Sequence, residues 1–219
     1  MKRREVLRLF GTATVTGVTG CLSASGGDGN VVLPPQEDQL GESEDLSYPA
    51  YGQRFPEFTL ANPLTDGTAV SVDPERVTLA TAIYASCPAE CLVLGNQLAG
   101  VQHSVNDEGH SDSVRFLAVT FDPERDTAPV LRDYADRMGV DLDAGNWQFG
   151  RPENPEEAES VVTGELGIGF EREGGEFTHV VLTFLVNPDG YVERAYRGER
   201  PEIERLVKDT RTVAEEYDV

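Results

Sequence analysis

The stretch "VTLATAIYASCPAEC", residues 77 to 91, joins an apolar run to a pair of cysteines. Val77 to Ala85 are nearly all apolar, β-branched or aromatic, which is typical of a central strand covered on both faces. Pro88 suits the first position of a helix, because its missing N–H has no partner there. An apolar stripe follows at helical spacing: Cys91, Leu94, Leu98 and Val101. The stretch therefore predicts a strand leading into a helix, with Cys87 at the helix N-terminus.

The rest of the chain supplies the other elements of an α/β domain. A hairpin is expected between Phe55 and Val72, and a second buried strand over Val114 to Phe121. Further elements are helices over about 127–138 and 155–166, two strands from His179 to Gly198 joined by the "NPDG" turn at 187–190, and a last helix from Pro201. This order predicts a thioredoxin-like domain with three α/β/α layers and an N-terminal β-hairpin extension.

The N-terminus "MKRREVLRLFGTATVTGVTGC" has the form of an export signal. Arg3 and Arg4 form a twin-arginine pair, and the apolar stretch after them has only about half the ~20 residues of a spanning helix. "VTGC" resembles a lipoprotein cleavage site, in which Cys21 would become the lipidated first residue. Residues 1–21 are thus predicted to be a signal that leaves the protein lipid-anchored on the extracytoplasmic face of the membrane. A cytoplasmic protein with a chance basic start is the alternative.

Composition separates a tether from the domain and excludes one class of partner. Residues 22–48 are rich in Gly, Ser, Pro and acids, which predicts a flexible acidic tether before a domain at 49–219. The chain carries 18 basic and 39 acidic side chains, a net charge of −21. A phosphate backbone would be repelled, so nucleic acid is not an expected partner. Scattered acids with only two lysines, Lys2 and Lys208, resemble a halophilic surface.

The two domain cysteines, Cys87 and Cys91, allow three uses: a structural disulfide, a redox couple or a metal clamp. Residues four apart are neighbours on a helix surface, so both sulfurs can meet one ion or, with local bending, each other. A helix N-terminus also favours the thiolate of the first cysteine by lowering its pKa. The spacing alone does not choose between the three.

Three stretches carry a resemblance to a known family: "YASCPAEC" (84 to 91), "VTFDPERDT" (119 to 127) and "HVVLTFLVNPDG" (179 to 190). Together they resemble the SCO/SenC family of thioredoxin-like copper proteins linked to cytochrome oxidase assembly. The resemblance implies that Cys87, Cys91 and His179 are copper ligands. Two soft thiolates and an imidazole suit copper in either oxidation state, and a three-coordinate site leaves room for a recipient's ligand.

The remaining polar candidates are weaker. Asp122 ends the second central strand, where it would either orient His179 and tune the copper or simply form the turn before Pro123. His103 and His110 fall in the polar stretch "QHSVNDEGHSDS", which we interpret as a loop with solvated histidines.

The expected function therefore depends on how the protein uses the cysteine pair. The leading hypothesis is a metallochaperone that assists copper insertion into the copper-site subunit of a respiratory oxidase. The alternative is a thiol–disulfide oxidoreductase that reduces the cysteines of that copper site and uses Cys87 and Cys91 as a redox-active pair. A third hypothesis is that the pair forms an inert structural disulfide, which would stabilise the protein little because the loop that it closes is so short.

Overall fold

The computed structural model describes residues 30–87, 90–173 and 176–219. The predicted signal, including Cys21, lies outside them. Within the described residues, no helix combines the length and apolar character needed to cross a bilayer.

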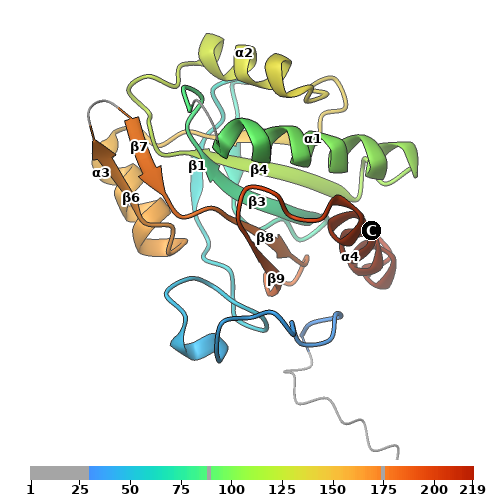
Figure 1. Cartoon of the computed structure of the whole chain (residues 1–219). Helices are drawn as coiled ribbons and strands as arrows, with labels where there is room; N and C mark the ends of the chain where they lie inside the picture. The colour runs from blue at the N-terminus through green and yellow to red at the C-terminus, as the bar shows by residue number, and fades with distance from the viewer. Residues whose placement is uncertain (1–29, 88–89, 174–175) are drawn as a thin grey trace, which may run out of the picture.

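A five-stranded sheet forms the centre of the domain, with strand order β5-β4-β3-β8-β9 (Figure 1). The strands are β3 (Val77–Ile83), β4 (Val114–Thr120), β5 (Trp147–Gly150), β8 (Leu182–Val186) and β9 (Val192–Arg197). β3, β4 and β5 are parallel, whereas β8 and β9 run antiparallel to their neighbours. Every residue of β3, β4 and β8 is buried, as their mostly apolar composition predicts, and the buried residues include the charged Arg115 of β4. β5 was not foreseen from the sequence.

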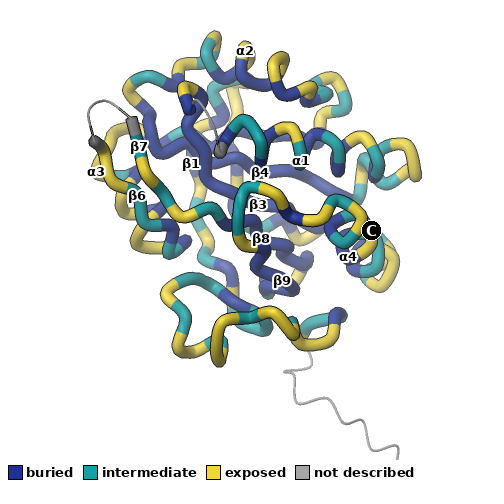
Figure 2. Tube along the Cα trace, viewed as in Figure 1, coloured by how far each residue is buried: buried dark blue, intermediate teal, exposed yellow. Residues whose placement is uncertain are grey.

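Three helices cover one face of this sheet: α1 (Glu90–Asp107), α2 (Ala128–Met138) and α4 (Ile203–Tyr217). α1 lies between α2 and α4 and contacts both (Figure 1). The predicted apolar stripe of α1 is buried throughout. The ring centroid of Tyr134 on α2 lies 6.3 Å from that of Phe149 on β5. Figure 2 shows the result, a buried sheet with helices exposed only on their outer sides.

The N-terminal hairpin packs against the opposite face of the sheet. Its strands are β1 (Thr59–Ala61) and β2 (Thr68–Val70), which confirms the predicted hairpin. Phe149, which contacts Tyr134 of α2, pairs with Ala118 of β4. Alternate residues of a strand point to opposite faces, so Arg115, three residues from Ala118, points away from α2. Its buried guanidinium donates to the carbonyl oxygens of Val70 and Ser71. Burial lowers the pKa of Arg115 to about 10. These bonds fasten the hairpin to the sheet.

A second hairpin follows β5 and precedes β8 in the chain, and His179 lies in this hairpin. Helix α3 (Pro155–Ala158) continues as the π-helical segment η2 (Glu159–Glu165), and together they confirm the predicted helix. β6 (Phe170–Glu173) and β7 (Glu176–His179) then pair antiparallel. The sequence predicted that His179 begins a strand, but it ends β7, and β8 begins at Leu182.

The described part of the expected tether, residues 30–48, differs from a flexible segment. It includes a short 3₁₀ turn, η1 (Ser43–Asp45), and runs beside β9 (Figure 1). The backbone N–H groups of Val32 and Leu33 donate to the buried carboxylate of Glu193 at 2.9 Å. Gln36 both donates to and accepts from the backbone of Ala195 on β9. Its side-chain amide thus continues the sheet's hydrogen bonding at the β9 edge.

Candidate metal centre

The two cysteines lie where β3 passes into α1. Cys91 is in the first turn of α1, whereas Cys87 precedes the helix in a turn closed by its N–H bond to the carbonyl oxygen of Tyr84. The sequence had placed Cys87 at the helix N-terminus, directly before Pro88, and Cys91 on the helix. The backbone N–H of Cys91 donates to Sγ of Cys87 at 3.3 Å. A sulfur that accepts a helical N–H at the positive end of the helix dipole is stabilised as thiolate.

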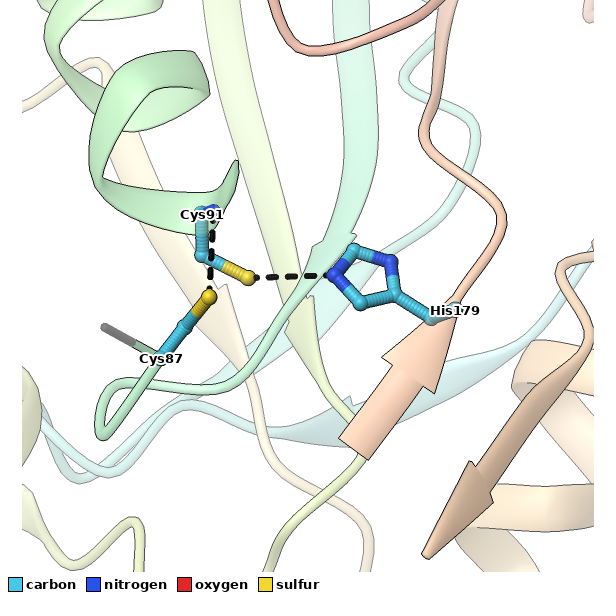
Figure 3. A group of neighbouring side chains, drawn as sticks. All are labelled: Cys87, Cys91 and His179. Atoms are coloured by element: carbon cyan, nitrogen blue, oxygen red, sulfur yellow. Dashed lines mark hydrogen bonds between the residues drawn. The ribbon is translucent and has the colours of Figure 1, made fainter. Parts of the chain in front are cut away.

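His179 reaches the cysteines from the end of β7. Its Nε2 lies 3.4 Å from Sγ of Cys91 (Figure 3). Its Nδ1 lies 3.1 Å from the carbonyl oxygen of Val180. A carbonyl can only accept, so this contact favours the tautomer with its proton on Nδ1. The lone pair of Nε2 then points towards the sulfurs, as a metal ligand requires.

The three side chains form a group that fits a metal ion. The two sulfurs and the imidazole nitrogen all lie within 4.8 Å of one another. An ion bonded at about 2.3 Å to three ligand atoms in trigonal-planar geometry holds these atoms about 4 Å apart. The three side chains therefore need at most a small movement towards one another to bind it. Both cysteines are buried and His179 is half-buried. Two sulfurs and one nitrogen are a donor set for a soft or borderline ion such as copper.

Aromatic rings shield the site from water. The His179 ring lies 5.1 Å from Phe121 and meets Tyr84 edge-on at 6.2 Å. Burial first, and then a hydrogen bond with Cys87, raise the pKa of Tyr84 to about 12. Tyr84 therefore stays neutral near pH 7, and its hydroxyl also approaches the carbonyl oxygen of Phe177 at 3.4 Å. The ring thus links the cysteine loop to β7.

The contacts of Asp122 match one of the two roles that the sequence left open. Its buried carboxylate pairs with Arg125, and its carbonyl oxygen accepts from the N–H groups of Arg125 and Asp126. Nδ1 of His179 is instead oriented by Val180. These contacts agree with the turn-forming alternative for Asp122, and the expected orienting bond to His179 is not among those of the described residues.

The other two histidines lie outside the metal-binding group. His103 is not in a loop as predicted but on α1, where the side chain is exposed and Nε2 lies 2.9 Å from the carbonyl oxygen of Gly139. His110 follows the helix and is half-buried.

Three side chains near the cysteines were missed by sequence reasoning. Asp126 accepts a hydrogen bond from the N–H of Ala85, Arg137 donates to the Ala85 carbonyl oxygen, and Tyr134 donates to the Cys91 carbonyl oxygen. Asp126 stands in the quoted stretch "VTFDPERDT", which was its only signal. Nothing local distinguishes Arg137 or Tyr134 from other residues of an amphipathic helix.

Comparison with known proteins agrees with this geometry. The SCO1/SenC family model matches residues 56–215, which include all three members of the cysteine–histidine group. The chain belongs to the SCO1/SenC family. Among curated proteins, none matched the chain.

Solved structures of SCO1/SenC proteins share the fold. A SCO1/SenC family lipoprotein from Bacillus anthracis matches with a TM-score of 0.65 and 17% identity, over 77% of this chain and 96% of its own. BsSco, a member of the Sco family of cytochrome c oxidase assembly proteins, matches with a TM-score of 0.63 and 22% identity, over 77% and 96%. Arabidopsis thaliana ScoI with copper bound matches with a TM-score of 0.59 and 17% identity, over 74% of this chain and 98% of its own. The predicted thioredoxin-like fold is thus confirmed.

Proposed function

We propose that this protein is a copper metallochaperone that acts on the extracytoplasmic face of the membrane and supplies copper to a respiratory oxidase subunit. The observation that carries the proposal is the convergence of Cys87, Cys91 and His179 within 4.8 Å, although His179 is 88 residues from Cys91 in the chain. Family membership supports it, as do relatives with copper bound from Arabidopsis thaliana and Bradyrhizobium japonicum.

The geometry suits copper as a cargo. Buried thiolates and aromatic neighbours keep water from the ion, while the half-buried His179 lies at the open side of the group. Three protein ligands leave a coordination position for a ligand of the recipient, so the ion can pass by stepwise ligand exchange without entering water. Loss of the histidine ligand would then release copper from the more exposed side first.

A second candidate function is thiol–disulfide exchange with the same recipient. Cys87 and Cys91 are close enough for the N–H of one to bond the sulfur of the other. As a thiolate, one cysteine would attack a disulfide of the partner and form a mixed disulfide, releasing one partner thiolate. The second cysteine would then attack the mixed disulfide and release the other partner thiolate, which leaves the partner reduced and Cys87–Cys91 oxidised. The oxidised pair cannot hold copper, so the two functions would alternate rather than coincide.

Removal of His179 separates the two functions. His179→Ala deletes one ligand and leaves both thiols and their helix N-terminus, so copper(I) binding should weaken by more than about tenfold, equivalent to about 1.4 kcal/mol. Disulfide formation should persist. Copper(I) competition titration and a thiol–disulfide assay measure the two effects, and His103→Ala serves as the control because His103 is an exposed histidine outside the group.

Oxidase assembly under copper limitation decides between the two functions. A chaperone requires His179, so the His179→Ala protein should fail to support assembly in cells. If it supports assembly at the wild-type level, thiol exchange becomes the better account.

The anchor is tested by fractionation. Wild type should accompany the membrane and Cys21→Ala should not, because the lipid would be attached to Cys21. Lysine replacement of both Arg3 and Arg4 should block export. Equal solubility of wild type and Cys21→Ala would argue against a lipid anchor.

A further inference from the structure

The backbone of Ala85, just before the metal-binding cysteines, is held by charged side chains at both its N–H group and its carbonyl oxygen. The carboxylate oxygen Oδ2 of Asp126 accepts from the N–H of Ala85 at 3.0 Å. On the other side, Nη2 of Arg137 donates to the carbonyl oxygen of Ala85 at 3.0 Å. Ala85 is fully buried and lies two residues before Cys87. Hydrogen bonds to charged groups are stronger than neutral ones, so the two peptide groups that flank Ala85 have little freedom to rotate.

The position of Asp126 is itself fixed. The hydroxyl of Thr120, at the end of β4, donates to the same oxygen Oδ2. Asp126 is fully buried, and its other oxygen, Oδ1, has no hydrogen-bond partner among the described residues. A buried carboxylate with an unsatisfied oxygen costs free energy. A neutral side chain would avoid this free-energy cost. The carboxylate is therefore retained for the hydrogen bond that it accepts from the Ala85 N–H.

The second cysteine is held from the same side of the domain. The hydroxyl of Tyr134, on α2, donates to the carbonyl oxygen of Cys91 at 2.9 Å. The loop of Cys87 and the first turn of α1 are therefore both fastened to the segment 126–137, which contributes no metal ligand. Relative placement of the two sulfurs depends on these bonds, because Cys87 lies in the loop and Cys91 in the helix.

We propose that Asp126, together with Arg137, is a positioning residue of the metal centre, which sets the place of Cys87 by clamping the backbone of Ala85 at its N–H group and its carbonyl oxygen. The proposal deepens the proposed function and rests on it for its copper readout. Without the clamp, the Ala85–Cys87 turn can rotate, and Sγ of Cys87 moves relative to Cys91 and His179. Both the affinity for copper and the ease of closing the Cys87–Cys91 disulfide should then change.

The test compares Asp126→Ala, Asp126→Asn and Arg137→Ala in the full chain. Copper(I) affinity is measured by competition with a chromophoric chelator. The Cys87–Cys91 disulfide is equilibrated in glutathione buffers, in which the two thiols lose two protons and two electrons to oxidised glutathione. The matched control is Asp209→Ala, which removes a nearly buried acid that bonds Tyr196 on the far strand β9.

Asp126→Ala should weaken copper binding by about tenfold or more and shift the glutathione ratio at the disulfide midpoint, because a displaced ligand costs this much. Asp126→Asn keeps an acceptor oxygen for the Ala85 N–H and should remain within about threefold of wild type. Wild-type values for Asp126→Ala, equal losses in both Asp126 variants, or an equal shift in the Asp209→Ala control would each overturn the proposal.

Two further readouts keep the test decisive. If Asp126→Ala does not fold, Arg137→Ala decides the matter, since the Arg137 side chain is 45% exposed and its removal should not endanger the fold. It should weaken copper binding by at least about threefold, and wild-type affinity would overturn the clamp. If wild type itself binds no copper, the proposed function fails, but the disulfide midpoints of the variants still test the positioning role.

Discussion

Gly95 offers a steric test of how α1 is seated beside the metal centre. It faces α2, and a Cβ at this position would lie 2.3 Å from the hydroxyl oxygen of Tyr134 and 2.8 Å from Cγ of Met138. Cβ atoms in proteins essentially never approach heavy atoms this closely, so Gly95→Ala must displace both side chains. The Tyr134 bond to the Cys91 carbonyl oxygen would be lost with them.

The expected cost follows from three contributions. Overpacking a well-packed core costs about 1–3 kcal/mol. Loss of the Tyr134 hydrogen bond adds about 1 kcal/mol. Alanine gains about 1 kcal/mol over glycine in a helix interior. The last two nearly cancel, so Gly95→Ala should lower the free energy of unfolding by about 1–3 kcal/mol.

Gly100, on the same helix, provides the matched control. A Cβ there would meet only Cδ1 of Ile203 at 3.5 Å, an ordinary contact. Gly100→Ala should therefore raise the free energy of unfolding by about 0.5–1 kcal/mol through helix propensity alone. Urea unfolding followed by circular dichroism measures both variants. In a Tyr134→Phe background the penalty for Gly95→Ala should shrink, because the nearest atom is gone. Equal stability of Gly95→Ala and Gly100→Ala would refute the reasoning.

Two further predictions concern buried carboxylates. Burial raises the pKa of Asp126 to about 6, so its folded form binds a proton more tightly than the unfolded chain. Its stabilising contribution is full below pH 4 and is lost as pH rises through 6, by about 3 kcal/mol at about 1.36 kcal/mol per pKa unit. The difference in unfolding free energy between wild type and Asp126→Asn should fall by this amount from pH 4 to 7.5, and a flat difference contradicts it. Glu193→Ala leaves the N–H groups of Val32 and Leu33 without their acceptor, which should cost about 2–4 kcal/mol and speed their hydrogen exchange. Unchanged exchange of these two amides would show that another contact holds the segment.

Local sequence determined the elements whose environment imposes a composition. β3, β4 and β8 are covered on both faces, so each is mostly apolar, with Arg115 of β4 as the charged exception, and such runs are visible without the fold. The buried stripe of α1 was visible for the same reason, because one helical face repeats at a fixed spacing. β6 and β7 were missed, since "FERE" and the residues after it carry charges that do not announce a strand.

The sequence also identified the cysteine pair and, through its family-like motifs, His179. No local pattern separates His179 from the other two histidines, so only the motif distinguished it. The fold alone decided that its Nε2 lies beside Cys91, that Val180 rather than Asp122 orients it, and that Asp126 holds the peptide before Cys87. It also decided that residues 30–48 lie against β9 rather than forming a free tether. A polar residue has the same local sequence whether it faces water or a distant backbone group. Its partner is set by how remote segments pack, and that choice is made only when the chain folds.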